Sequence, residues 1–187
     1  MPDNKIKYLS KQEVERFFEA IKNPRDQAVF ALIYYYGLRV SEVCLITPED
    51  IDWCKEKIYI RRVKSGISGE KPLSPRIKEI LTDYLVVRQP TGQALFTGRQ
   101  GNLSCARIAQ LFKAYAKKAG LASCYTVHSL RHSIATHLLA SGEGIEFVKD
   151  HLGHVNIQST MIYAQLTDKK REEVFKRMEE SEEVAKF

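Results

Sequence analysis

The sequence predicts a mainly α-helical α+β protein with a small antiparallel β-sheet inserted in its first half. Apolar residues recur at helical spacing through most of the 187-residue chain, whereas alternating β-branched and aromatic residues are confined to one short stretch. No Pro-, Gly- or Ser-rich linker divides the chain. A chain of this length can bury a core without disulfides or metals, so we expect one compact domain over residues 1–187.

Three helices are expected before the strands. The run Ser10-Lys11-Gln12-Glu13 is a capping box that opens the first helix, and Asn23-Pro24 ends that helix and starts the next. Residues 26–36 are apolar nearly all round, which is typical of a buried helix. Gly37 fits a C-cap, and Ser41 fits the N-cap of a short helix that ends before the next proline.

The sheet is predicted from residues 57–73. The segment KIYIRRV, residues 57–63, alternates as a half-buried strand does, and SGISG, residues 65–69, forms the turn. Residues 70–73 return as a second short strand. The apolar run at residues 94–96 fits either a third strand or a loop anchor.

The rest of the chain is predicted to be helical. Further helices are expected over residues 76–87, 104–119, 128–140, 145–152, 156–163 and 168–186. Residues 168–187 carry six basic and seven acidic residues, so this tail is not expected to be a DNA-binding arm. Its only apolar cluster consists of Val174, Phe175 and Met178.

The charge of the chain favours an anionic partner, most often nucleic acid. Lys and Arg total 29 and Asp and Glu total 23, a formal net charge of +6. Residues 55–78 hold eight basic and two acidic residues, so the excess is concentrated on the predicted hairpin and the helix start after it. The DNA contacts expected there are Lys57, Arg61, Arg62, Lys71, Arg76 and Lys78.

Several classes of protein are set aside. No run of 18 apolar residues predicts a membrane span, and residues 1–10 lack the apolar segment of a secretion signal. The four cysteines form no CxxC pair, so no zinc or thioredoxin-type site is expected. Scattered cysteines fit a reducing cytosol, and we expect a cytoplasmic protein without membrane contacts.

Three short motifs contain the residues suited to chemistry. Arg39 lies in GLRVSE, residues 37–42, and alone could be a surface pair with Glu42. His128 and Arg131 are three residues apart on a predicted helix, so they share a face that suits a phosphate. HLGH, residues 151–154, is followed nine residues later by Tyr163. Each motif alone is more simply explained as structural.

Together these residue types form one chemical set. Arginines stabilise the charge of a five-coordinate phosphorus, a tyrosine hydroxyl can act as a covalent nucleophile, and histidine can move its proton near neutral pH. A lysine on the hairpin can protonate a leaving oxygen. The sequence shows neither a metal-ligand cluster nor a Gly-rich nucleotide loop, so neither divalent ion nor ATP is expected as a cofactor.

Four segments in order resemble the tyrosine recombinases, or phage-type integrases, in their C-terminal catalytic domain. The segments are GLRVSE (37–42), HSLRHSIATHLLASG (128–142), HLGH (151–154) and STMIYAQL (159–166). The resemblance runs from about residue 8 to residue 165. It implies the recombinase fold and an enzyme that recombines or integrates DNA at specific sites.

The resemblance also implies a role for each matching residue. Tyr163 would attack the scissile phosphate, form a 3′-phosphotyrosyl link and release a 5′-hydroxyl. Arg39 and Arg131 would hold the non-bridging oxygens, and His128 and His154 would hydrogen-bond the phosphate and take part in proton transfer.

The same resemblance implies roles for a lysine and for an acidic residue. Lys64, directly after the predicted strand, would protonate the leaving 5′ oxygen, with Lys71 as the alternative. Glu42 would orient the first arginine or a neighbouring histidine. The histidines without a catalytic counterpart in the family are interpreted as structural: His132, His137 and His151.

Family members usually carry a separate N-terminal DNA-clamping domain, whereas only nine residues precede the first predicted helix here. The resemblance implies double-stranded DNA at a recombination site as a partner, together with three further copies of the chain in a tetramer on DNA. In such a tetramer the tail cluster of Val174, Phe175 and Met178 would pack on a neighbouring protomer, and packing on its own domain is the equal alternative. The free protein is expected to be a monomer in the nucleoid. The alternatives are a non-catalytic DNA-binding accessory module of a mobile element and a type IB topoisomerase.

Overall fold

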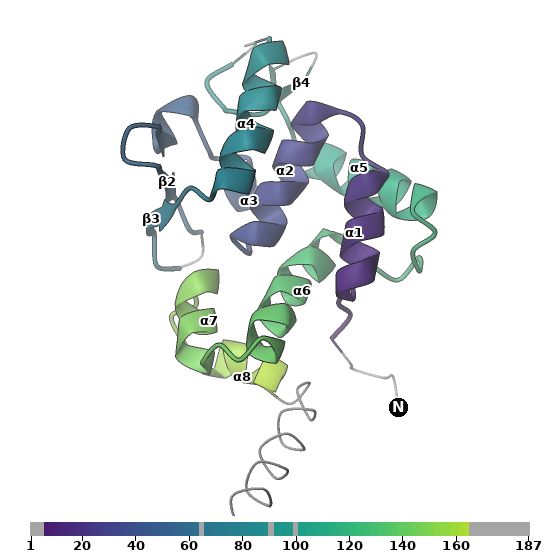
Figure 1. Ribbon diagram of the computed structural model, residues 1–187, viewed down its shortest axis with the longest axis vertical. Helices are drawn as coiled ribbons and strands as arrows, with labels where there is room; N and C mark the ends of the chain where they lie inside the picture. Colours follow the sequence, from purple (N-terminus) through teal and green to yellow (C-terminus); the bar gives the residue numbers. More distant parts are fainter. Residues whose placement is uncertain (1–5, 64–65, 90–91, 99–100, 165–187) are drawn as a thin grey trace, which may run out of the picture.

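The computed structural model describes residues 6–63, 66–89, 92–98 and 101–164. In this part the chain is mostly helical with small antiparallel sheets, as predicted (Figure 1). The helices are α1 (Lys11–Glu19), α2 (Pro24–Tyr35), α3 (Val40–Val43), α4 (Pro75–Val87), α5 (Cys105–Lys118), α6 (Val127–Ala140), α7 (Ile145–Leu152) and α8 (Gln158–Ala164). The predicted tail helix lies outside the described residues. No helix among the described residues is long and apolar enough to cross a membrane.

The predicted hairpin is present, with one extra strand. β2 (Lys57–Ile60) pairs antiparallel with β3 (Gly69–Pro72) and with the two-residue β1 (Ile51–Asp52), which follows a 3₁₀ turn at Pro48–Asp50. A separate ladder joins β4 (Thr97–Gly98) to β5 (Gly101–Asn102). β2 stops three residues earlier than predicted because the backbone N–H of Arg62 donates to Ser68 Oγ (2.9 Å) and not to a strand carbonyl.

The structure decides one open alternative and corrects one expectation. Residues 94–96 form a loop anchor and no strand, since the Leu95 N–H donates to the Ile46 carbonyl (2.7 Å) in the described chain. The short helix α3 begins at Val40 and is capped at Arg39, whose backbone N–H donates to the Glu42 carboxylate (2.9 Å). Ser41 therefore lies inside the first turn of this helix. The capping box at Ser10 and Glu13 is present as predicted.

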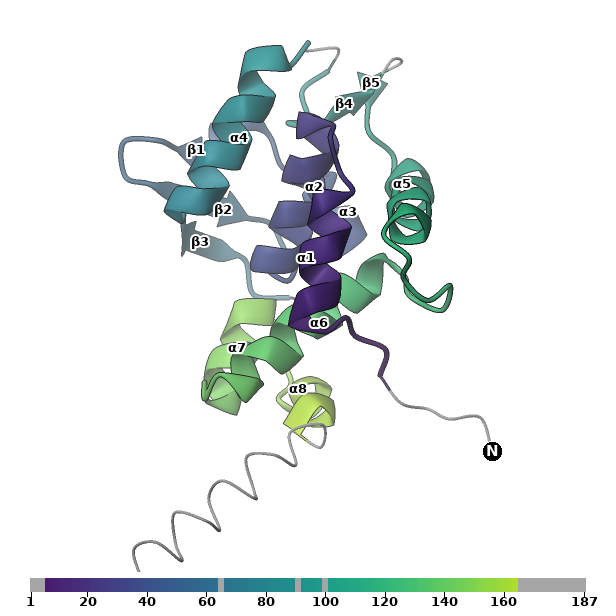
Figure 2. The same ribbon diagram turned by 45° about the vertical axis from the view of Figure 1, so that its right-hand side comes forward.

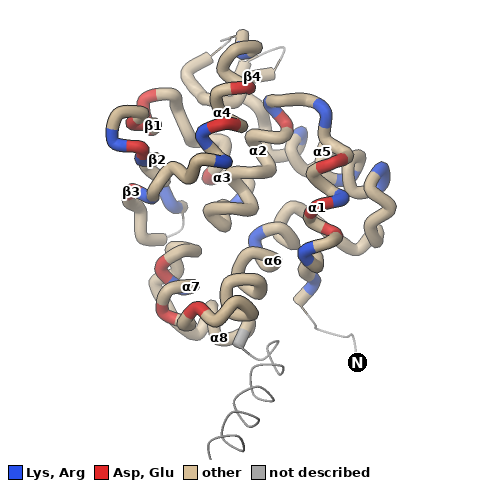
Figure 3. The backbone as a smooth tube through the Cα atoms, viewed as in Figure 1, with Lys and Arg blue, Asp and Glu red and all other residues tan. Residues whose placement is uncertain are grey.

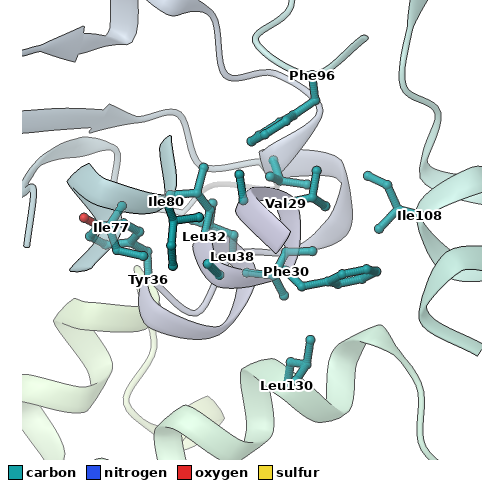
Figure 4. Close-up of a cluster of buried hydrophobic side chains, with 14 of the residues drawn as sticks. Val29, Phe30, Leu32, Tyr36, Leu38, Ile77, Ile80, Phe96, Ile108 and Leu130 are labelled. Carbon is teal, nitrogen blue, oxygen red and sulfur yellow. The ribbon is translucent and has the colours of Figure 1, made fainter. Parts of the chain in front are cut away.

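Helix α2 is the centre of the main core. Leu32 of α2 and Ile77 of α4 belong to the same buried cluster, as do Phe30 of α2 and Leu130 of α6 (Figure 4), and Phe30 also contacts aromatic rings of α5. A second, smaller cluster lies among α6, α7 and α8. It consists of Ile134, Ala135, Leu139, Val148, Leu152 and Tyr163. Figures 1 and 2 show these three helices gathered at one end of the molecule, next to the β2–β3 hairpin.

A buried arginine joins the hairpin to the helices. The Arg62 side chain is 1% exposed, and its guanidinium donates to Glu42 (2.9 Å) and to the carbonyls of Tyr36 (3.1 Å) and His151 (2.6 Å). Gly153 lies against it at a φ of 68°, and a Cβ there would be 2.7 Å from Arg62 Nε. Arg62 therefore ties the end of β2 to the ends of α2 and α7.

Replacement of Arg62 with Met is expected to lower the free energy of unfolding by about 3 kcal/mol, because it removes one partner of a buried ion pair. The matched control is Arg76→Met, which breaks the exposed pair with Glu79 and should cost less than about 1 kcal/mol. Urea unfolding of both variants measures the difference. Equal losses would show that the Arg62 contacts contribute no more than a surface pair.

Candidate active site

A buried carboxylate holds three arginines together. The Glu42 side chain is fully buried, with Oε1 2.7 Å from Arg39 Nη1 and Oε2 2.9 Å from Arg62 Nη1 and 3.8 Å from Arg131 Nη1. Burial alone would raise the pKa of Glu42, but hydrogen bonds from the Arg39 backbone and from Arg62 outweigh it and lower that pKa. Three guanidinium charges against one carboxylate leave two positive charges uncompensated within the cluster.

Arg131 is fixed by the backbone around it. Its guanidinium donates to the carbonyls of Gly37 and Leu152 (3.1 Å for Leu152) and to His154 Nε2 (2.8 Å). Burial, followed by the charges of Arg39 and Arg62, lowers the pKa of Arg131 to about 10, so the group stays charged at neutral pH. A phosphate next to these arginines would relieve their mutual repulsion.

His154 lies in the turn between α7 and α8. Burial and the nearby Arg131 lower its pKa to about 4, so the ring is neutral at neutral pH. Because Arg131 can only donate, Nε2 accepts and the ring proton is on Nδ1, which donates to Thr160 Oγ1 (2.9 Å). His154 thus helps to hold the Arg131 guanidinium in place through this hydrogen bond.

Tyr163 is paired with a histidine that the sequence interpretation assigned to structure. Its side chain is 2% exposed, and its hydroxyl lies 2.7 Å from His132 Nδ1. Burial raises the pKa of Tyr163, against the opposing charges of Arg131 and Arg39. The motif HSLRH contains His132 directly after Arg131, but no spacing in the sequence shows that α8 returns to this point of α6.

The remaining members of the expected set lie around this cluster. His128 is exposed on the first turn of α6, one turn before Arg131, and the Arg39 side chain is 25% exposed. Lys64 and Ser65 lie outside the described residues, whereas Val63 and Ile67, before and after them, are described. The Val63 N–H donates to Glu42 Oε1 (3.4 Å), and the Ile67 N–H donates to the Gly153 carbonyl (3.3 Å).

The basic residues expected to contact DNA form no unpaired strip. Lys57 pairs with Glu70, Arg61 with Asp50, Lys71 with Asp150, Arg76 with Glu79 and Lys78 with Glu56. Figure 3 shows blue and red segments mixed along this side of the molecule. Arg62 is interior, so it is not at a surface that a DNA backbone could follow. The partner of Lys71, the alternative catalytic lysine, is Asp150 on α7.

The other two histidines contact α2. His137 Nδ1 is 2.9 Å from the Tyr34 hydroxyl, and His151 Nε2 is 2.9 Å from the Tyr35 carbonyl. Among the residues that the structure describes, no group of three or more His, Cys, Asp or Glu side chains could hold a metal ion.

Comparisons with known proteins agree with the resemblance seen in the sequence. Tyrosine recombinase XerA of Pyrococcus horikoshii is 35% identical over 173 residues, which cover 90% of this chain and 60% of that protein. XerD of Staphylococcus epidermidis is 34% identical over 154 residues, 76% of this chain and 50% of the relative. The chain thus spans between half and two-thirds of the length of these relatives.

Solved structures share the fold. A crystal structure of XerA recombinase superposes with a TM-score of 0.81 at 28% identity, covering 95% of this chain and 66% of the other. A lambda integrase dimer bound to a COC′ core site gives a TM-score of 0.70 at 20% identity, covering 87% and 49%. Residues 7–170 match the model of the phage integrase family, and the chain therefore belongs to that family.

Proposed function

We propose that this protein is a site-specific DNA recombinase that cleaves and rejoins strands with Tyr163 as its nucleophile. The observation that carries the proposal is the cluster that forms around Glu42, where Arg39 and Arg131 lie against the carboxylate and His154 is hydrogen-bonded to Arg131. Arg39 comes from the α2–α3 junction, Arg131 from α6 and His154 from the α7–α8 turn, and Tyr163 on α8 lies within the electrostatic influence of both arginines.

The arginines supply the binding and the stabilisation. A phosphodiester that approaches the partly exposed Arg39 meets a cluster with two uncompensated positive charges. Negative charge on the phosphorus oxygens grows in the five-coordinate transition state, so donors already held in place stabilise that state more than the ground state. His128, one turn before Arg131, would donate to the same phosphate.

The reaction exchanges one ester for another. Tyr163 Oη bonds to phosphorus while the bond to the 5′ oxygen breaks, which leaves a 3′-phosphotyrosyl link and a 5′-hydroxyl. Lys64 would give the leaving oxygen its proton. The phosphotyrosyl ester conserves the energy of the broken bond, so attack by another 5′-hydroxyl rejoins DNA without ATP.

Solved relatives support a DNA substrate. XerH is seen bound to a difH substrate in a post-cleavage complex, and a transposon integrase is seen with transposon right-end DNA. By analogy with these relatives, we assign double-stranded DNA at a specific site as the substrate. We further propose that the active assembly is a tetramer on DNA and that the protein is located in the nucleoid. A binding module that does not cut DNA has no need of a tyrosine beside an arginine pair.

The first prediction concerns the nucleophile. A DNA duplex nicked near its cleavage site should trap a covalent adduct that survives boiling in detergent. The Tyr163→Phe variant should trap none, because it lacks the attacking oxygen. Tyr59→Phe, which removes an exposed hydroxyl on β2, should trap as much as the parent protein. Adduct formation by Tyr163→Phe would exclude Tyr163 as the nucleophile.

The second prediction concerns the phosphate clamp. In Arg39→Ala, Glu42 keeps its buried pair with Arg62, so the fold should persist. Loss of one preorganised donor should slow cleavage by about 10²-fold or more. Affinity for DNA should fall much less, since it is spread over many phosphates. Single-turnover cleavage and gel-shift titration separate the two effects, and an equal loss in both would assign Arg39 to binding alone.

A further inference from the structure

A histidine outside the family-derived set is in direct contact with the proposed nucleophile. His132 Nδ1 lies 2.7 Å from Tyr163 Oη, with the two ring centroids 5.6 Å apart. His132 is on α6 and Tyr163 on α8, and these helices pack together. The contact thus depends on the tertiary fold.

The ring of His132 is suited to accept a proton. Burial, followed by the charges of His128 and Arg131, lowers the pKa of His132 to about 4, so the ring is neutral at neutral pH. A neutral ring with its proton on Nε2 presents the Nδ1 lone pair to the tyrosine. Tyr163, whose pKa is raised by burial, keeps its proton in the DNA-free protein and can donate it along this hydrogen bond.

We propose that His132 is the general base of strand cleavage, and that its Nδ1 takes the hydroxyl proton as Tyr163 Oη attacks. This inference rests on the proposed function, in which Tyr163 is the nucleophile. In the step, the O–H bond of Tyr163 breaks, the proton goes to Nδ1, the oxygen bonds to phosphorus and the 5′ oxygen leaves. The leaving oxygen takes its proton from a different group, so the imidazolium is retained until rejoining returns the proton to Tyr163.

The charged groups around His132 make its basicity depend on whether a phosphate is bound. The charged and titratable groups that act on the pair are His128 and Arg131 from α6, together with Arg39, which acts on Tyr163. A bound phosphate offsets the positive charges of these arginines. This weakens the contribution of Arg131 to the lowered pKa of His132, so the ring becomes a stronger base when DNA is bound.

The test uses a duplex with a sulfur in place of the scissile 5′ oxygen. A thiolate leaves without needing a proton, so the pH dependence of single-turnover cleavage reports activation of the nucleophile. His132→Ala should cleave about 10²-fold or more slowly than the parent at pH 7. Because hydroxide then has to take the proton, this deficit should shrink by about tenfold per pH unit as the pH rises to 9.

Two further variants separate basicity from packing. His132→Gln can still accept a hydrogen bond from Tyr163 but is not a base, so it should share the slow, pH-dependent rate of His132→Ala. The matched control is His137→Gln. His137 lies on the same helix as His132, and its Nδ1 makes a similar contact, 2.9 Å from the hydroxyl of Tyr34 on α2. This control should keep the parent pH profile. Thermal melting of each variant establishes that it is folded.

The outcomes are distinguishable. A parent-like rate in a folded His132→Gln variant would reduce His132 to a hydrogen-bond partner and overturn the inference. A deficit that is the same at every pH would overturn it too. Adducts formed by Tyr163→Phe would overturn the proposed function itself, whereas an inactive Tyr163→Phe with a normal His132→Gln would overturn only the role of His132.

Discussion

The structure depends on one buried carboxylate shared by three guanidinium groups. An ionised Glu42 could not be held in the interior alone, because removing it from water costs several kcal/mol. Arg39 and Arg62 offset this cost through close contacts, and Arg131 stands slightly farther away. The same carboxylate caps α3 through the Arg39 backbone. A single side chain therefore sets both the local fold and the position of the groups available to a phosphate.

The excess positive charge is stabilised by the ends of two helices. Arg62 donates to carbonyls of Tyr36 and His151, and Arg131 donates to carbonyls of Gly37 and Leu152. These carbonyls lie at the C-termini of α2 and α7, where the helix dipole places partial negative charge. Two of the three arginines are thus satisfied by backbone, and Arg39 is left as the partly exposed one. The backbone carbonyls around Arg62 and Arg131 explain how the positively charged cluster remains folded when no anion is bound.

Local signals in the sequence predict most of the fold. The capping box at Ser10, the apolar run of α2 and the alternation of KIYI all depend on near neighbours, and the structure contains each of the elements that they predict. The early end of β2 and the cap of α3 depend on short-range contacts, from the Arg62 N–H to Ser68 Oγ and from the Arg39 N–H to Glu42. The side chains of Arg62 and Glu42, however, pair across 20 residues. The contact between His132 and Tyr163 spans 31 residues and two turns of chain, which no periodicity encodes. The sequence thus indicates which residues are suited to the chemistry, whereas only the tertiary structure shows which of these side chains contact one another.

The distribution of charge illustrates the same limit. Residues 55–78 hold a large basic excess in the sequence, yet Arg61 and Lys71 pair with Asp50 and Asp150 from outside that window. Neutralisation in space removes much of the field that a count along the chain would assign to the hairpin, because exposed pairs screen each other over a few ångströms. The buried cluster around Glu42, by contrast, keeps two uncompensated positive charges. The hairpin contributes to this cluster through Arg62, which places one of the three guanidinium groups beside the buried carboxylate.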